Sequence, residues 1–330
     1  MKRIRTDLAV VGAGCAGLAA AVSAREKGIE DVLILERSPG MGGVLRQCIH
    51  NGFGIHTFGE DLTGTEFAHR YIGLAKEAEV SCLLRTFVQD IRDTGTGTEL
   101  TAVNRDGQFQ VEAKSVILAT GCRERPRGNL LIPGTRPSGI FTAGTAQRYL
   151  NLEGYLVGKR IVILGSGDIG LIMARQFVLE GAEVLAIAEI MEKSGGLLRN
   201  IVQCVEDFDI PLYYRTTVSR ICGTNRVEGV ELVSVDEKLN QIQGTERTIP
   251  CDTLVLSVGL IPENELAFEA GIAMNSKTGG PAVTDRFETS MPGVYSCGNS
   301  LFVHDLVDNV ALEGIKVGAF AAEYIRRIRA

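Results

Sequence analysis

The sequence predicts an α/β protein with two nucleotide-binding domains, and three observations support this prediction. A short apolar run followed by G-x-G-x-x-G and a helical pattern occurs twice, at residues 8–17 and 161–170. In each copy an acidic residue ends a second apolar run about 20 residues further on. Both halves then continue with strand-like runs and a last apolar run that ends in glycine. The repeat predicts two Rossmann-like three-layer domains that each bind one dinucleotide.

The first glycine-rich turn, Gly12-Ala13-Gly14-Cys15-Ala16-Gly17, has the spacing of a pyrophosphate site. The first glycine allows a tight turn, the second lets the pyrophosphate approach the backbone, and the third lets the helix lie close to the strand. Phosphate oxygens then meet free N–H groups at the positive end of the helix dipole. Glu36 ends the following apolar run, where a carboxylate can accept hydrogen bonds from both ribose hydroxyls.

The second turn, Gly165-Ser166-Gly167-Asp168-Ile169-Gly170, repeats this arrangement, and Glu189 is its acidic residue. The match continues at one constant offset, because residues 42–46 and 195–199 share a Gly-Gly-x-Leu-Arg pattern. Two coincidental turns would not keep a common register this far. Glu189 would repel a 2′-phosphate, so we expect NAD(H) rather than NADP(H). We expect Asp168 to bond the backbone of its own turn.

Composition narrows the function classes. The chain has 330 residues, 45% apolar and 22% charged, which is typical of a folded protein of two domains. A net charge of −6 and the lack of basic tracts argue against nucleic-acid binding. No apolar run approaches the ~20 residues of a membrane span, and the first strand begins at once, with no room for a signal peptide. The eight cysteines show no C-x-x-C spacing, and no Cys, His and carboxylate cluster suits a metal, so we expect reduced thiols, a cytoplasmic location and no metal.

The order of the runs sets the expected domain boundaries. The apolar run 116–118 ends in Ala119-Thr120-Gly121, and its counterpart in the second half ends at Gly259. The tail is too short for a separate domain, so we expect it to return to the first. The first domain then comprises residues 1–153 and 260–330, and the second, residues 154–259, is inserted in it. Further expected elements are helices at 67–78 and 307–328 and strands near 80–91, 100–104, 109–116, 212–221, 227–235 and 247–249.

These motifs resemble those of the two-dinucleotide-binding flavoproteins, the pyridine nucleotide–disulfide oxidoreductase superfamily, in its short thioredoxin-reductase-like form. The resemblance covers nearly the whole chain and implies an FAD/NAD(P)-dependent oxidoreductase, with FAD in the first domain and NAD(H) in the second. The family's late G-V-x-x-x-G-D motif reads here as residues 293–299, with Asn299 in place of Asp. Asparagine can bond a ribityl hydroxyl or accept from backbone N–H, but it carries no charge.

The resemblance implies two sets of cofactor-binding residues, and the last three members of the first set begin the helix that points at the flavin pyrimidine ring. The FAD set is Gly12, Gly14, Cys15, Ala16, Gly17, Glu36, Arg37, Gly42, Gly43, Val44, Leu45, Gln47, Val88, Ala119, Thr120, Gly121, Gly298, Asn299, Asn309, Val310 and Ala311. The NAD(H) set is Gly165, Gly167, Asp168, Ile169, Gly170, Glu189 and Gly259.

One departure from the family changes the expected function. Disulfide reductases carry a cysteine pair beside the flavin, and this sequence has none, which argues against thioredoxin or glutathione reduction. Residues 42–54 look more like flavin subunits of heteromeric dehydrogenases of the opine, cyanide-forming or glycerol-3-phosphate type. The resemblance implies hydride exchange between NAD(H) and flavin, electron transfer with a dehydrogenase or iron–sulfur partner subunit or a small acceptor, and an oligomer. An alternative is a partner-dependent subunit with little activity alone.

Candidate catalytic residues lie in the glycine-rich loop 38–58. Cys48 is placed like the redox thiol of single-cysteine NADH oxidases and peroxidases, a third alternative, although a small packing residue is the simpler interpretation. His50 and His56 could relay a proton to the flavin or bond the loop. His304 and Asp305 could lie over the isoalloxazine, although Asp305 is more simply a helix cap.

Overall fold

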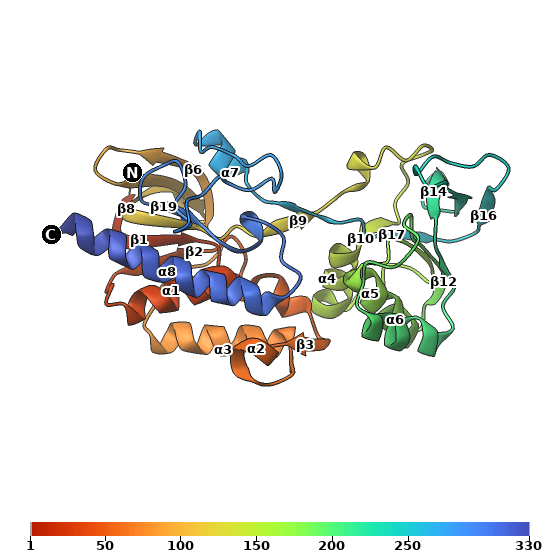
Figure 1. Cartoon of the computed structure of the whole chain (residues 1–330), viewed down its shortest axis with the longest axis horizontal. Helices are drawn as coiled ribbons and strands as arrows, with labels where there is room; N and C mark the ends of the chain where they lie inside the picture. Colours follow the sequence, from red (N-terminus) through yellow and green to blue (C-terminus); the bar gives the residue numbers. More distant parts are fainter. Residues whose placement is uncertain (1, 330) are drawn as a thin grey trace. The chain divides into compact units, whose positions relative to one another are not determined.

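The computed structural model describes residues 2–329 and contains two compact units (Figure 1). The first unit comprises residues up to Arg123 and from Ile261 on, and the second comprises Glu124–Leu260. The second is thus inserted in the first, as predicted, but the first crossing lies well before the expected boundary at 153/154. The reason is that β10 (Ile140–Thr142) pairs in parallel with β17 (Thr253–Leu256) of the second unit.

The first unit contains a sheet of seven strands in the order β5-β2-β1-β8-β7-β6, with β19 also paired to β8. Strands β5, β2, β1, β8 and β19 are parallel, which is a Rossmann-type order, whereas β6 and β7 form an antiparallel meander with β8. The strands are β1 (Lys2–Val11), β2 (Val32–Leu35), β5 (Ser81–Leu83), β6 (Phe87–Asp93), β7 (Thr98–Asn104), β8 (Gly107–Leu118) and β19 (Val294–Ser296).

Two expected strands of this unit differ in the structure. The run expected at 80–91 forms two strands, β5 and β6, because the chain turns at Arg85, which has a φ of 52°. The expected runs 109–116 and 116–118 form one strand, β8, which leaves the antiparallel meander and enters the parallel sheet. A non-glycine turn residue and a strand shared by two layers leave no periodicity signal in the sequence.

Three helices cover one face of this sheet: α1 (Cys15–Glu26), α3 (Gly64–Glu77) and α8 (Val307–Arg329) (Figure 1). The antiparallel meander and α7 (Glu265–Glu269) cover the other face. Helices α1 and α8 approach closely because α8 has glycines at the contact. A Cβ on Gly314 would lie 2.5 Å from the carbonyl oxygen of Ala16, and a Cβ on Gly318 would overlap that of Ala20. The expected last helix and the return of the tail are therefore confirmed.

The second unit repeats this architecture. Its parallel sheet has the order β10-β17-β11-β12-β13, with helices on one face and an antiparallel meander on the other. The sheet adds β11 (Arg160–Leu164), β12 (Glu183–Ala188) and β13 (Leu212–Tyr213), the helices are α4 (Ala143–Glu153), α5 (Asp168–Leu179) and α6 (Leu198–Cys204), and the meander is β14 (Thr216–Cys222), β15 (Gly229–Ser234) and β16 (Arg247–Ile249).

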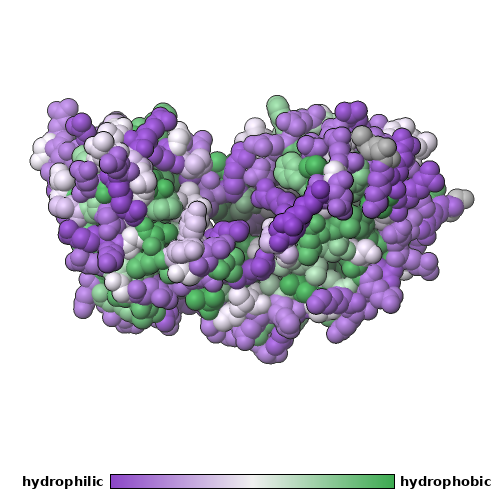
Figure 2. Space-filling model, turned by 180° about the vertical axis from the view of Figure 1, so that it is seen from behind, coloured by the Kyte–Doolittle hydropathy of each residue, from purple (hydrophilic) through white to green (hydrophobic). Residues whose placement is uncertain are grey.

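Short elements complete the chain. The glycine-rich loop is ordered by a 3-10 helix, a hairpin strand and one helical turn, and two further strands carry the chain between the units. The short elements are η1 (Gly43–Gln47), β3 (Asn51–Phe53), α2 (Ile55–Phe58), β4 (Leu62–Thr63), β9 (Cys122–Glu124), η2 (Arg127–Asn129), η3 (Glu206–Phe208), β18 (Leu260–Pro262) and η4 (Gly298–Ser300). Polar residues cover most of the face drawn in Figure 2, and apolar residues reach it in separate patches. Within residues 2–329 no helix has the length and apolarity to cross a membrane.

Candidate dinucleotide sites

The two glycine-rich turns occupy equivalent places in the two units. The first joins β1 to α1, beside the point where the chain order of the sheet reverses between β1 and β8. The second joins β11 to α5, beside the reversal between β11 and β17. Crevices at such points, outside the carboxyl ends of parallel strands, are where open α/β sheets bind ligands.

The first and third glycines of each motif are fixed by close backbone contacts. Gly12 and Gly165 have φ angles of 108° and 99°, and a Cβ on either would overlap a carbonyl oxygen of the neighbouring strand end. A Cβ on Gly17 would overlap the carbonyl oxygen of Gly12, and a Cβ on Gly170 would lie 2.7 Å from that of Gly165. These four positions therefore admit only glycine, whatever the ligand.

The middle glycines are different, and they show where a ligand fits. A Cβ on Gly14 would meet no protein atom within 4 Å, and on Gly167 it would meet only the Ser257 hydroxyl, at 4.0 Å. Neither residue has a positive φ, since their φ angles are −75° and −68°. The fold itself does not require glycine at either place. A pyrophosphate that lies against the backbone does require it, so both turns fit a dinucleotide.

The two acidic residues hold the turns in the same way. Glu36 accepts hydrogen bonds from Ala13 N at 2.7 Å and Ser38 N at 2.6 Å. Glu189 accepts from Ser166 N and Met191 N, both at 2.9 Å, and Oε2 of Glu189 also accepts from the Ser166 hydroxyl at 2.6 Å. The two residues are only 5% and 7% exposed. Each keeps an oxygen with one remaining lone pair, which suits acceptance from a ribose hydroxyl.

Asp168 makes different contacts from those expected. Its Oδ1 accepts from Leu197 N at 2.8 Å and from Asn200 Nδ2 at 2.7 Å, so it bonds the loop before α6 and the first turn of that helix rather than its own turn. The sequence expectation missed these partners because they lie about 30 residues away along the chain. Asp168 thereby fixes the loop that follows Glu189 against the N-terminus of α5.

The glycine-rich loop of the first unit lies against the first turn. Gly42 N donates to Ala13 O at 2.8 Å, and a Cβ on Gly43 would lie 3.0 Å from Gly14 Cα. In η1, Leu45 and Gln47 are buried, whereas Val44 is exposed. Among the other predicted FAD residues, Arg37 is exposed and Val88 is buried in the core beneath the meander, two residues after Thr86, whose N–H donates to Glu36 O.

Two further strand ends converge on the same turn. Ala119 follows β8 and packs over Gly12, and the hydroxyl of Thr120 donates to Glu263 O at 2.7 Å. Gly298 follows β19, and a Cβ on it would lie 2.8 Å from Ala16 Cβ. The first helical turn of α8 holds three more predicted residues, of which the first is exposed and the other two are buried: Asn309, Val310 and Ala311.

Asn299 keeps polar partners without a charge. Its Oδ1 accepts from His304 N at 3.0 Å, as expected of an asparagine here, and its Nδ2 contacts Cys122 Sγ at 3.5 Å. The ring of His304 contacts that of Phe302, at a centroid distance of 4.0 Å, and its Nε2 lies 3.5 Å from Glu313 Oε2. Glu313 also accepts from Gly298 N at 2.5 Å. These contacts fix the loop between β19 and α8.

Asp308 is a site residue that the sequence analysis missed. It is 3% exposed, at the start of α8, and accepts from three backbone N–H groups of the glycine-rich loop: Gly54 at 3.1 Å, His56 at 3.1 Å and Thr57 at 2.8 Å. The Thr57 hydroxyl donates to it as well, at 2.7 Å. Burial raises the pKa of Asp308, but these hydrogen bonds outweigh burial and leave its pKa below the ordinary value.

The expected helix cap, Asp305, does not have this role. Asp305 is exposed, and within residues 2–329 no hydrogen bond to its side chain is present. The carboxylate that ties the start of α8 to the rest of the unit is that of Asp308, three residues later. The signal available in the sequence was weak, because an acidic residue in a first helical turn is commonly only a dipole contact.

Cys48 is packed rather than poised as a thiolate. Its Sγ contacts Val44 O at 3.5 Å, and its Cβ lies so close to α3 that a Cβ on Gly64 would be 2.5 Å away. Burial raises the pKa of Cys48 to about 12. These contacts favour the packing interpretation over the redox one. Of the two loop histidines, His50 contacts Asn51 O through Nδ1 at 3.0 Å, and His56 is exposed.

The protonated, buried state of Cys48 leads to a prediction. Cys48→Ser should leave NADH-dependent oxygen or peroxide turnover within about twofold of the wild type, since a thiol with a pKa near 12 supplies almost no thiolate at neutral pH. Turnover is measured by NADH consumption in air and with added peroxide. Cys82→Ser, which removes a thiol from β5 outside the loop, is the matched control. Loss of turnover in the Cys48 variant alone would return this residue to the mechanism.

Metal and disulfide chemistry find no ready group in the described part of the chain. Within residues 2–329 no group of three or more His, Cys, Asp and Glu side chains could hold a metal ion. All eight cysteines lie in this range, and none forms a disulfide.

The paired turns, their acidic residues and the shared sheet order define a protein with two dinucleotide-binding domains. The chain belongs to the pyridine nucleotide-disulphide oxidoreductase family, which it matches over residues 6–314. Members of this family are FAD-dependent oxidoreductases that bind FAD and NAD(P)H. The chain is thus a flavin oxidoreductase of that family.

Particular relatives refine the comparison. One of the two kinds of opine oxidase chain, from Agrobacterium tumefaciens (strain Ach5), is 28% identical over 89% of this chain and 61% of its own length. The alpha subunit of sarcosine oxidase from Corynebacterium sp. (strain U-96) is 26% identical over 78% of this chain and 27% of its own length. The chain therefore spans less than two thirds of these curated relatives. The crystal structure of T. acidophilum thioredoxin reductase is similar with a TM-score of 0.78, 25% identity, and coverage of 97% of this chain and 98% of the other.

Proposed function

We propose that this chain exchanges a hydride between NAD(H), bound in the second unit, and FAD, bound in the first, and passes the electrons to or from a partner protein. The observation that carries the proposal is the duplicated turn geometry, in which each middle glycine leaves open backbone and each acidic residue faces its turn. Bound FAD would supply the hydride chemistry, and the protein would supply position and electrostatics.

The residues of the first unit have distinct tasks in this proposal. Backbone N–H groups at the start of α1 face the place of the pyrophosphate, where the helix dipole favours negative charge. Glu36 orients the adenosine ribose, and the loop from Gly42 to Gln47 covers the turn. Asp308 holds the next part of that loop to α8, so that the segment carrying His50 and His56 has one conformation.

A partner is proposed as the electron acceptor or donor for two reasons. First, no cysteine pair with disulfide chemistry is present in the described chain, so the usual dithiol route of the family lacks its groups. Second, two relatives are named as subunits of larger oxidases. A dehydrogenase or iron–sulfur subunit fits this role. The alternative, a subunit with little activity alone, is favoured by the same relatives.

The core of the proposal is tested by anaerobic flavin reduction. The protein, reconstituted with FAD, should lose its yellow absorbance when NADH is added without oxygen. A colourless protein that retains no FAD after reconstitution would contradict the proposal. Purification from the native host with a tag then separates the two alternatives, because a solitary and fully active chain would contradict partner dependence, and a chain active only with its co-purified protein would support it.

Nucleotide choice gives the sharper prediction. NADH should reduce the flavin at least about tenfold more effectively than NADPH at limiting concentrations, since a 2′-phosphate would meet the buried Glu189 carboxylate. Glu189→Ala should narrow this preference, and it should also weaken NADH binding because Ser166 N loses its acceptor.

The matched control is Glu192→Ala. Glu192 lies three residues further on, is 66% exposed in its side chain and pairs with Arg215, so its removal changes the net charge equally but leaves the turn intact. Rapid-mixing flavin reduction with both nucleotides measures the preference. Equal rates for NADH and NADPH in the wild type would contradict the role assigned to Glu189, and so would an equal effect of the two substitutions.

A further inference from the structure

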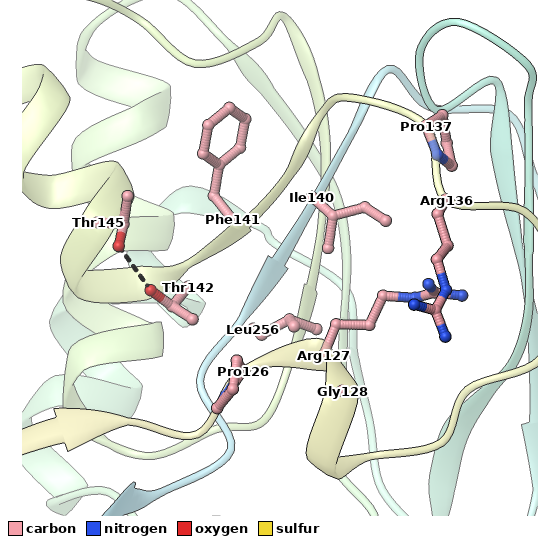
Figure 3. A pocket seen from close by; sticks show the side chains of 10 residues that line it. All are labelled: Pro126, Arg127, Gly128, Arg136, Pro137, Ile140, Phe141, Thr142, Thr145 and Leu256. Atoms are coloured by element: carbon pink, nitrogen blue, oxygen red, sulfur yellow. Dashed lines mark hydrogen bonds between the residues drawn. The ribbon is translucent and has the colours of Figure 1, made fainter.

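We propose that a cavity in the second unit, separate from its dinucleotide turn, binds a small organic phosphate monoester through Arg127 and Arg136. The cavity lies between the segment that enters the unit, residues 126–137, and the ends of β10 and β17 (Figure 3). Neither Glu189 nor any residue of the Gly165–Gly170 turn lines it. The inference therefore does not depend on the proposed hydride exchange.

The cavity has the size and lining of a small-molecule site. Its volume is about 470 Å³, within the range of natural ligand pockets. Ile140, Phe141 and Leu256 form an apolar wall, and Thr142 and Thr145 carry hydroxyl groups at one end, where they bond each other at 2.8 Å (Figure 3). The two arginines line the other end (Figure 3).

The arginine pair lacks a neutralising charge. The two guanidinium groups are near neighbours in Figure 3, and the closeness of Arg136, together with burial as the larger cause, lowers the pKa of Arg127. Nη2 of Arg127 donates to Ile132 O at 2.9 Å, but its Nε is buried without a hydrogen-bond partner. No carboxylate forms an ion pair with either arginine within residues 2–329. Two adjacent cations and a buried donor without an acceptor are unfavourable unless an anion binds there.

The sequence around the cavity explains why no acid answers this charge. Residues 125–152 contain no Asp or Glu at all. Glu124, the nearest acid along the chain, is occupied at the start of α4, where it accepts from Gly144 N at 2.6 Å, from Thr145 N at 3.1 Å and from the Thr142 hydroxyl. The cavity is consequently positive at the arginine end and not at the threonine end, which orients an anionic ligand.

The chemistry of the lining selects the ligand class. A phosphate monoester carries close to two negative charges and three terminal oxygens, so it can accept from both guanidinium groups at once. Its organic part would lie on Ile140, Phe141 and Leu256, which an inorganic ion would leave uncovered. A carboxylate matches one guanidinium but supplies only one charge for the two. The site thus favours a dianionic head with an apolar body.

Titration calorimetry with three probes tests the proposal on the full chain. Phenyl phosphate should bind best, benzoate at least about tenfold more weakly, and benzyl alcohol not measurably, because only the first satisfies both arginines. Inorganic phosphate should bind more weakly than phenyl phosphate because it leaves the apolar wall uncovered. Saturating NADH should leave the phenyl phosphate affinity unchanged.

Variants locate the binding. Arg127→Gln and Arg136→Gln should each lower phenyl phosphate affinity about tenfold or more, and the exposed Arg136 keeps the test valid even if the Arg127 variant folds poorly. Arg148→Gln is the matched control, since this arginine lies on α4 outside the cavity and pairs with Glu153. Competition by NADH, equal affinity for benzyl alcohol, no binding to the wild type, or an equal loss in the Arg148 variant would each overturn the proposal.

Discussion

Gly17→Ala should prevent stable folding of the first unit, whether or not FAD is present. The added Cβ would overlap the carbonyl oxygen of Gly12 and would also lie 3.2 Å from Val10 Cγ1, so that α1 must move away from β1. Both groups belong to buried elements of the same core, which cannot shift independently. The expected loss of unfolding free energy is about 4 kcal/mol or more, which places this change among the most severe single substitutions.

Gly14→Ala is the control that gives this prediction its meaning. Its Cβ would meet no protein atom within 4 Å, and its φ of −75° is ordinary for alanine. The FAD-free protein should therefore unfold within about 0.5 kcal/mol of the wild type, while FAD retention falls steeply, because the methyl group occupies the place of the pyrophosphate. Urea unfolding and the flavin content of the dialysed protein measure the two effects. A severe loss of stability in the Gly14 variant, or normal FAD retention, would contradict the assignment of this turn.

Asp308→Ala should release the glycine-rich loop from α8. Three backbone N–H groups and the Thr57 hydroxyl would lose their common acceptor in a buried place, which should cost about 2–4 kcal/mol of unfolding free energy. Hydrogen exchange should quicken at Gly54, His56 and Thr57 before it changes elsewhere. Flavin reduction by NADH should slow as well, since this loop follows directly on the segment that covers the first turn.

The charge of Asp308 gives the same experiment a pH dependence. Its pKa in the folded protein lies below the ordinary value of 3.8, so its contribution to stability is present above that value and is lost as the pH falls through the folded-state pKa. Asp308→Asn keeps one acceptor oxygen and cannot ionise. The difference in stability between wild type and this variant should therefore shrink in acid. A difference that is constant from neutral pH to about pH 3 would show that the charge of Asp308 has no role.

The sequence allowed prediction of those parts of the fold and sites that depend on local pattern. The glycines at 12, 17, 165 and 170 are demanded by contacts within their own strand–turn–helix units, and these contacts have a fixed spacing along the chain. The hydrogen bonds of Glu36 and Glu189 to their turns follow from the same spacing. The length of the last helix could be predicted for a similar reason, since its apolar stripe runs without interruption.

The features that escaped prediction depend on partners far apart in the chain. Asp308 bonds a loop about 250 residues earlier, and no pattern in a single sequence connects the two. The same limit applies to Asp168 and its partner Asn200, and to the early boundary of the second unit, which depends on the pairing of β10 with β17. The charge of the Arg127 and Arg136 pair becomes apparent only when the segment between them folds back on itself.

The insertion of one unit in the other has a consequence for synthesis on the ribosome. Every residue of the second unit emerges before β19 and α8 are translated, although the first unit has by then already contributed β1, α1 and most of its sheet. Until α8 arrives, the side of α1 that carries Ala16 and Ala20 has no cover, because Gly314 and Gly318 are the residues that close over it. A half-made chain thus holds one finished unit and one that displays bare apolar surface, which makes this nascent state, rather than the completed protein, the natural client of a chaperone.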